Sequence, residues 1–242
     1  MKGVLSLQDA INAAYSAFSD VPRPTAMDAS PVKNHAEIEK AVRPVGLREL
    51  TSEDLGYYSA SAMTTIGDAS DFQYFLPRIL DISTREAGSY GFEPWLIVHK
   101  LNYANWDSWP AAKRAAVFDV FRSAFLFTAH LHPDNYPEVH EWLTGLMLLG
   151  EYPEPYVAVW KHGDPMPSLL QFAAAVNWYC PSSDDREGIE DFSDAVQKRI
   201  IGWLKEPGTR ALIEEGLSRA SDQDEWKFQL ALSKLDGLRP EG

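Results

Sequence analysis

Cysteine is almost absent from this chain of 242 residues, and the single one, Cys180, cannot form an internal disulfide. Long apolar runs are missing too: no stretch approaches the ~20 residues that span a bilayer. The amphipathic N-terminus, with one lysine, lacks the apolar core of a signal peptide. A chain with these features is expected to be soluble and cytoplasmic, because the reducing cytoplasm is the usual compartment of proteins without disulfides.

Basic residues are scarce relative to acidic ones. Lys and Arg number 22 against 35 Asp and Glu, which gives a formal net charge of −13 and a pI of about 4.8. A surface this acidic repels phosphate groups, so we expect binding neither to nucleic acid nor to membranes. The same charge favours solubility and leaves open a basic protein partner.

The sequence signatures of several large enzyme classes do not occur. The chain contains no GxSxG, no Walker loop, no GxGxxG that opens a helix after a strand, and no CxxC. Cys180 follows aromatic residues and precedes a proline, an arrangement typical of a buried thiol rather than a nucleophile. We therefore expect no cofactor.

Alternation typical of β-strands is also rare, whereas helical spacing of apolar residues dominates. The best candidate strand, YVAVW at Tyr156, is equally typical of a buried helical turn. Sixteen prolines mark most of the connections. The pattern predicts an all-α fold, an irregular array or bundle of roughly ten to twelve antiparallel helices. We expect residues 1–242 to form a single helical domain, with a weak subdivision near residues 135–155.

Two neighbouring segments carry strong local signals. Thr51 and Asp54 form a variant of the capping box, which predicts a helix whose apolar face continues to Ile66 and which Gly67 closes. Ser70 then has the character of an N-cap for DFQYFLPRILDIS, although Pro77 in its middle removes a helical hydrogen bond. This segment is expected either to kink at Pro77 or to begin a new helical turn there.

The residue after that proline, Arg78, has two interpretations. On a helix, Arg78 and Asp81 are three residues apart and can form an ion pair that fixes the geometry. Alternatively, Arg78 points out of the bend and binds a partner. A nearby pair, Trp95 and His99, permits a general base at His99, but a structural histidine is the favoured interpretation.

A second candidate is the histidine-rich stretch HLHPDNYPEVH, which contains His130, His132 and His140 together with two carboxylates. Imidazole and carboxylate are ordinary ligands of zinc and iron. However, His130 and His132 are two residues apart, which places them on different faces of a helix, and no HExxH motif is present. The simpler interpretation is a helix C-terminus followed by a proline turn.

A third candidate is NWDSWP, in which Trp106 and Trp109 flank a helix start. Tryptophan is enriched in interaction hot spots, so the two rings are candidate partner-binding residues. The core is the favoured location, because a chain with eight tryptophans must bury most of them.

The N-terminal half resembles a family of helical bacterial proteins that has no established activity. The residues that carry the resemblance are GLRELTSEDLGYYSASAMTTIGDASDFQYFLPRILDIS, preceded by AAYSAFSDVPRP and followed by a tryptophan-rich pattern from Lys100 to Trp109. Many members have a cysteine cluster before the LREL segment, whereas here that loop reads MDASPVKNHAE. The resemblance implies a mostly helical bacterial cytoplasmic protein without a thiolate site in that loop.

Two functional hypotheses follow. The first is a non-enzymatic protein-interaction module of a regulatory or toxin-neutralising kind, with Arg78, Trp106 and Trp109 as candidate contact residues. The second is a metal-binding protein or metal-dependent hydrolase that uses the region from His130 to His140. The sequence indicates neither the oligomeric state nor a substrate.

Overall fold

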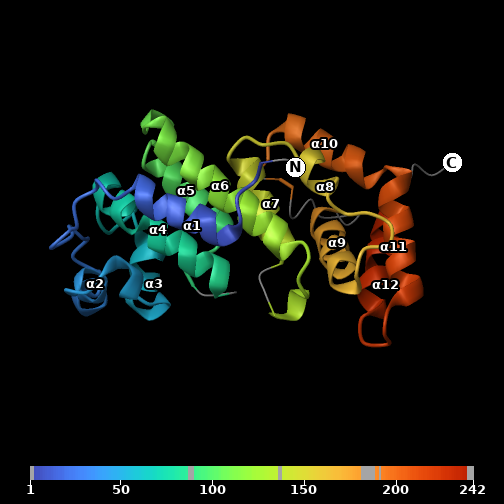
Figure 1. The fold of residues 1–242 in the computed structure, drawn as a ribbon, viewed down its shortest axis with the longest axis horizontal. Coiled ribbons are helices and arrows are strands. Elements are labelled where there is room, and N and C mark those ends of the chain that lie inside the picture. Colours follow the sequence, from blue (N-terminus) through green and yellow to red (C-terminus); the bar gives the residue numbers. More distant parts are fainter. Residues whose placement is uncertain (1–2, 87–89, 136–137, 181–188, 191, 239–242) are drawn as a thin grey trace. The chain divides into compact units, whose positions relative to one another are not determined.

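The computed structural model describes residues 3–86, 90–135, 138–180, 189–190 and 192–238, and their backbone is almost entirely helical (Figure 1). The described residues form no β-strand and contain only isolated bridges, such as that between Ala29 and Ile66. Twelve α-helices and three 3-10 helices are present in this part of the chain. The all-α prediction is confirmed, and the segment at Tyr156 is a helical turn.

The chain divides into two compact units, residues 3–124 and residues 125–242, and the division falls inside a long helix. The first unit contains α1 (Leu7–Ala17), α2 (His35–Val42), η1 (Leu47–Glu49), α3 (Ser52–Ser61), α4 (Ala69–Arg85), α5 (Pro94–Tyr103), η2 (Trp106–Ser108) and most of α6 (Ala111–Thr128). The second contains the end of α6, η3 (Pro133–Asn135), α7 (Val139–Leu148), α8 (Glu154–Val157), α9 (Met166–Tyr179), α10 (Asp194–Leu204), α11 (Pro207–Arg219) and α12 (Glu225–Gly237). The expected single domain stays a prediction, since one domain can contain two compact units.

The helix that begins at the Thr51 capping box is shorter than predicted. The Asp54 amide donates to Thr51 Oγ1 over 3.2 Å and the Thr51 amide donates to Asp54 Oδ2 over 2.8 Å, which confirms the box. However, α3 ends at Ser61 instead of continuing to Gly67. Met63 adopts a positive φ of 65°, and its amide donates to the Ile66 carbonyl over 3.0 Å. The chain therefore turns back on itself, and Ile66 reaches the core from a loop.

The next helix, α4, runs through Pro77 without interruption from Ala69 to Arg85. Its N-cap is Asp68 rather than Ser70, because Asp68 and Asp71 form a second capping box. Proline has no amide hydrogen, so the carbonyl one turn earlier, that of Gln73, receives no helical bond from position 77. Pro77 is buried together with most of the apolar residues of this helix.

In the second unit, α9 is the helix around which the others pack. It contacts α7, α11 and α12, as Figure 1 shows. A chain of rings links it to its neighbours: Trp160 and Phe172 have ring centroids 5.2 Å apart, and Phe172 and Trp203 have centroids 5.9 Å apart. These ring contacts join the loop after α8 to α9, and α9 to α10.

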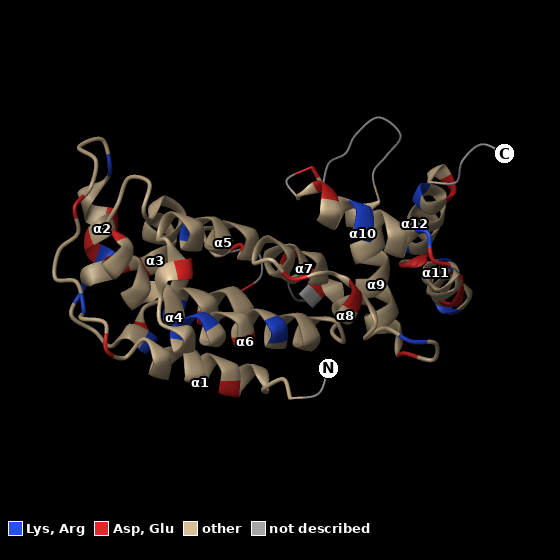
Figure 2. Ribbon diagram, turned by 90° about the horizontal axis from the view of Figure 1, so that it is seen from above, with Lys and Arg blue, Asp and Glu red and all other residues tan. Residues whose placement is uncertain are grey.

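Basic and acidic residues occur on helices of both units (Figure 2), but their numbers differ between the units. Residues 125–242 contain 20 Asp and Glu against 10 Lys and Arg, whereas residues 3–124 contain 15 against 11. The second unit therefore carries most of the acidity. No helix among the described residues is long and apolar enough to cross a membrane.

Candidate functional site

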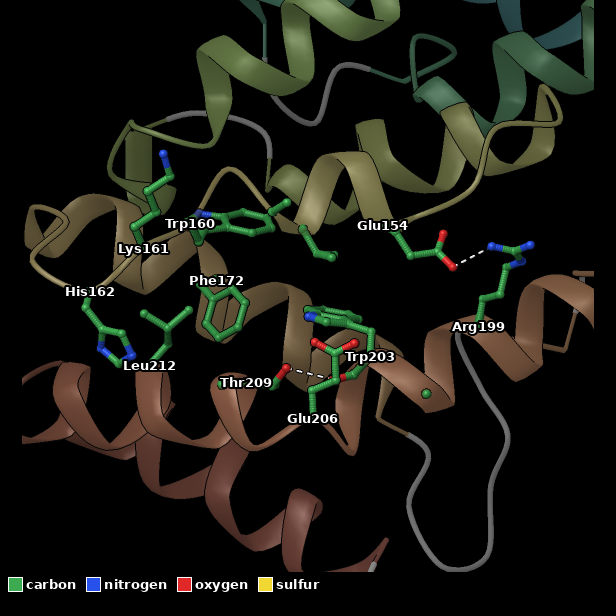
Figure 3. A pocket seen from close by; sticks show the side chains of 14 residues that line it. Glu154, Trp160, Lys161, His162, Phe172, Arg199, Trp203, Glu206, Thr209 and Leu212 are labelled. Carbon is green, nitrogen blue, oxygen red and sulfur yellow. Dashed lines mark hydrogen bonds and ion pairs between the residues drawn. The ribbon is translucent and has the colours of Figure 1, made fainter.

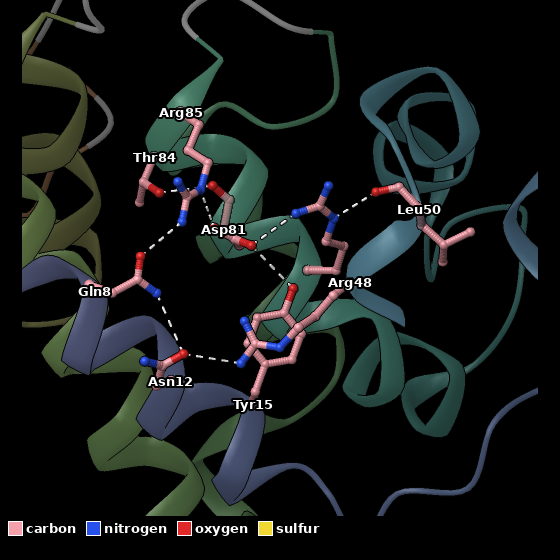
Figure 4. Close-up of polar contacts among 9 residues, drawn as sticks. Gln8, Asn12, Tyr15, Arg48, Leu50, Asp81, Thr84 and Arg85 are labelled. Atoms are coloured by element: carbon pink, nitrogen blue, oxygen red, sulfur yellow. Dashed lines mark hydrogen bonds and ion pairs between the residues drawn. The ribbon is translucent and has the colours of Figure 1, made fainter. Parts of the chain in front are cut away.

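Arg78 forms a polar cluster around the buried carboxylate of Asp81 (Figure 4). Its Nη1 lies 2.8 Å from Asp81 Oδ2, and its Nε donates to the Leu50 carbonyl over 2.6 Å. On the other side, Arg85 Nε lies 2.5 Å from Asp81 Oδ1. The Tyr15 hydroxyl donates to Asp81 Oδ2 over 3.3 Å. Asp81 thus joins two arginines of its own helix to α1.

The contacts continue from α4 into a closed ring through α1 and η1 (Figure 4). Arg85 donates to Gln8 Oε1 over 3.2 Å, and Gln8 donates to Asn12 Oδ1 over 3.5 Å. Arg48 also donates to Asn12, over 3.1 Å, and its guanidinium lies 3.6 Å from the centroid of the Tyr15 ring. The ring holds three elements together that are far apart in the sequence.

The surroundings of this ring favour a structural role for Arg78. Both of its bonds go to groups of the same unit, the Asp81 carboxylate and the Leu50 carbonyl. Burial and the Asp81 charge raise the pKa of Tyr15 to about 12, so its hydroxyl stays protonated and can donate at neutral pH. An interaction role for Arg78 stays a prediction.

The two tryptophans of NWDSWP are both buried in the first unit. Trp109 Nε1 donates to the Ala104 carbonyl over 3.2 Å, and its ring meets Phe18 edge to face at 5.8 Å. Trp106 packs against Phe118 with centroids 5.4 Å apart. The core interpretation accounts for these contacts, and the expected binding role of either ring stays a prediction.

The three histidines of the candidate metal region each lie beside a different residue. His130 Nδ1 lies 3.2 Å from Ser168 Oγ, whereas His132 Nδ1 lies 3.8 Å from a carboxylate oxygen of Asp134. His140 Nδ1 lies 3.0 Å from Glu138 Oε2. Among the described residues, no group of three or more His, Cys, Asp or Glu could hold a metal ion. Tyr136 and Pro137 of this stretch lie outside the described residues.

Part of the same stretch lines an aromatic groove that the sequence did not reveal. Trp178 of α9 and Trp226 of α12 are exposed by 47% and 57%, and Leu230 beside them is exposed too. Together they line a groove of about 400 Å³. The His140 ring stacks on Trp178, with centroids 4.1 Å apart and an interplanar angle of 18°. We call this the Trp178–Trp226 groove.

The polar lining of this groove contains carboxylates and lysines that mostly lie beside a partner of the same unit: Asp134 lies 3.2 Å from Lys227 Nζ and Glu138 lies 3.0 Å from His140 Nδ1. Lys234 Nζ donates to the Asn177 carbonyl over 2.5 Å. The lining also includes the buried Oδ1 of Asn177, which receives no hydrogen bond from the described residues. A positively charged hydrogen-bond donor of a partner could therefore bind to the free Asn177 Oδ1 in this groove.

The pKa of Glu138 is lowered by its neighbour His140. The hydrogen bond and charge of His140 hold the pKa of Glu138 below its ordinary value of 4.5, although partial burial opposes this shift. At neutral pH the groove lining consequently includes an ionised carboxylate, which lies beside the His140 ring that stacks on Trp178.

A second hollow, of about 530 Å³, lies between α8, α9, α10 and α11 (Figure 3). Its apolar wall consists of Trp160, Phe172, Trp203 and Leu212. Polar contacts lie at opposite ends of it: Arg199 forms an ion pair with Glu154 over 2.6 Å, and His162 Nδ1 is hydrogen-bonded to Glu215 over 2.8 Å. We call this hollow the Trp203 cleft.

The sequence contains a signal for the groove in the spacing of Trp226, Leu230 and Leu235 along α12. At 3.6 residues per turn, Leu235 lies roughly opposite Trp226. The buried face carries Phe228, Ala231 and Leu235, so Trp226 and Leu230 face outward. A helical-wheel projection alone would have separated the two faces.

Comparison with known proteins identifies no relative. No family model matches the chain, and neither a curated protein nor a solved structure shows significant similarity.

Proposed function

We propose that this chain is a non-enzymatic interaction protein, of a regulatory or toxin-neutralising kind, which binds a basic protein partner through the Trp178–Trp226 groove. The observation that carries the proposal is the exposure of two tryptophans from different helices in one groove. Tryptophan is among the residues most enriched in the hot spots of protein interfaces, and soluble proteins seldom expose clustered rings without a use for them.

The acidic excess of the second unit supports a basic partner at the Trp178–Trp226 groove. The groove belongs to the unit in which acidic residues outnumber basic ones two to one. The lining includes the carboxylates of Asp134 and Glu138, which lie beside Lys227 and His140, and the buried Asn177 Oδ1, which receives no hydrogen bond from the described residues. A partner side chain that combines a flat cation with an apolar stem satisfies both the rings and the carboxylates. Arginine fits this description better than lysine, because guanidinium stacks on indole.

The test is affinity purification from the native host, with quantitative mass spectrometry of wild-type protein and two variants. In the first variant, Trp178→Ala and Trp226→Ala remove the two rings of the groove. In the second, Trp95→Ala removes a ring that is exposed to a similar degree, 45%, but belongs to the other unit. The control thus matches the residue type and the exposure without touching the groove.

We expect a protein of basic isoelectric point to be recovered with wild-type protein and with Trp95→Ala, and to be lost from the groove variant. Recovery of the same partners by all three proteins would show that the groove is not the binding site. Repeated recovery of no basic protein by wild-type chain would contradict the proposed function itself.

A further inference from the structure

The Trp203 cleft has the size and lining of a site for a small molecule. Its volume of about 530 Å³ lies within the range of ligand pockets, roughly 300–1,000 Å³. Two glycines in its wall, Gly202 and Gly208, keep it open: a Cβ atom added to either would meet no other atom within 4 Å. Both glycines are exposed, whereas the rings of the cleft are buried and present only small parts of their surface to it.

Most charges around this cleft are already neutralised. Arg199 pairs with Glu154, and its guanidinium stacks on Tyr152 at 3.9 Å from the ring centroid. His162 is bonded to Glu215. The Lys161 side chain extends away from Trp203, as Figure 3 shows. None of these groups is positioned to neutralise a further carboxylate of the cleft.

That further carboxylate belongs to Glu206. Among the described residues, no side chain or amide bonds to its carboxylate oxygens, and although Glu206 is the N-cap of α11 it makes no capping hydrogen bond with its side chain. Its amide donates to the Trp203 carbonyl over 3.1 Å, which places Glu206 one turn after that tryptophan. An unpaired negative charge thus lines the same cleft as a wall of aromatic rings.

We infer that the Trp203 cleft binds a small organic cation that consists of a flat apolar body and an ammonium group. The body would occupy the hollow that Gly202, Trp203 and Leu212 line. The ammonium group would pair with the exposed carboxylate of Glu206, which lines the same hollow. This site is separate from the Trp178–Trp226 groove, and it does not depend on the function proposed for that groove.

Isothermal titration calorimetry with tryptamine tests this inference. Indole-3-acetate is the matched control ligand, because it carries the same ring with a negative instead of a positive charge. We expect tryptamine to bind at least about tenfold more tightly than indole-3-acetate, and Glu206→Gln to weaken tryptamine about tenfold, as loss of one charged hydrogen bond implies. The exposed Glu39→Gln, in the other unit, should leave the affinity unchanged.

A second variant separates binding from folding. Gly202→Leu fills the cleft from within α10, and it should abolish tryptamine binding. The same change should preserve or raise the melting temperature, because glycine inside a helix costs about 1 kcal/mol relative to good helix formers. Tryptamine binding should also survive Trp178→Ala, which alters only the groove.

Three results would overturn the inference. The first is that tryptamine does not bind at millimolar concentration. The second is that indole-3-acetate binds equally well, which would show that charge plays no part. The third is that a folded Gly202→Leu variant retains wild-type affinity, which would place the ligand elsewhere.

Discussion

Asp81 illustrates how a single buried carboxylate can hold several elements in place. It accepts from Arg78, Arg85 and Tyr15, and its side chain is only 5% exposed. Asp81→Asn leaves the Arg78 cation partly buried without a counter-charge. We expect the free energy of unfolding, measured with urea, to fall by about 3 kcal/mol.

The matched control for this change is Asp107→Asn, since Asp107 is exposed and lies in the same unit. A surface substitution of this kind should alter stability by no more than about 0.5 kcal/mol. Equal stability of the two variants would mean that the ring of polar contacts around Asp81 contributes nothing measurable.

Glu138 makes stability depend on pH in a definite direction. Its pKa is lowered in the folded state, chiefly by the hydrogen bond with His140, so its ionised form stabilises the fold. That contribution is complete at pH values well above the ordinary pKa of 4.5 and is lost as the pH falls through the lower, folded value. Glu138→Gln should therefore be less stable than wild type at neutral pH and equally stable in acid. Urea unfolding across this range measures the difference, and a difference that does not depend on pH would contradict the pairing.

At the scale of elements, substitution of alanine for two helical glycines, Gly216 and Gly202, should change the stability of the protein in opposite directions. A Cβ atom at Gly216 of α11 would overlap the ring of Phe228 in α12, with Cδ1 only 2.7 Å away, and Phe228 is fully buried. Gly216→Ala should therefore destabilise the protein by about 2 kcal/mol, as overpacked cores do. Gly202→Ala, which meets open space, should stabilise it by up to about 1 kcal/mol. Urea unfolding of both variants tests the packing of α11 on α12, and changes of the same sign would refute it.

Much of the helical architecture could be predicted from local chemistry. The Thr51 capping box starts α3, and Pro94 lies in the first turn of α5, because both signals act within a few residues. The predicted end of α3 was wrong. The chain turns at Met63, which has a positive φ, and no glycine at that position indicates the turn in the sequence. The prediction of Ser70 as the N-cap of α4 was also wrong. Asp68 and Ser70 are both residue types that cap helices well, and only the reciprocal hydrogen bonds with Asp71 favour Asp68.

The candidate sites were less accessible to sequence reasoning, because they depend on packing between distant segments. Trp178 and Trp226 are far apart in the chain and meet only because α9 packs against α12. The clusters chosen from the sequence were all local. Of the candidate histidines, His140 alone stacks on a groove tryptophan, and Asp134 and Glu138 of the same stretch line that groove.

At the scale of the whole molecule, the uneven charge predicts how binding responds to salt. A short peptide of alternating arginine and leucine should bind to wild-type protein, whereas a matched glutamate and leucine peptide should not, because the net charge is −13 and most of it lies in residues 125–242. Added salt should weaken binding, since exposed charges more than about 10 Å apart are screened at 0.1 M. Fluorescence anisotropy of labelled peptides measures both effects.

Variants can separate the contribution of the charges from that of the rings in this assay. Glu138→Gln should reduce both the affinity and its dependence on salt, because one acceptor of the groove becomes neutral. The double variant Trp178→Ala, Trp226→Ala should reduce the affinity while leaving the salt dependence nearly unchanged, because stacking on a ring involves little screened charge. A lysine and leucine peptide should bind more weakly than the arginine peptide to wild-type protein, and this preference should vanish when the rings are removed. If the preference survived their removal, the peptide would be held by acidity alone, and the groove would have no part in recognition.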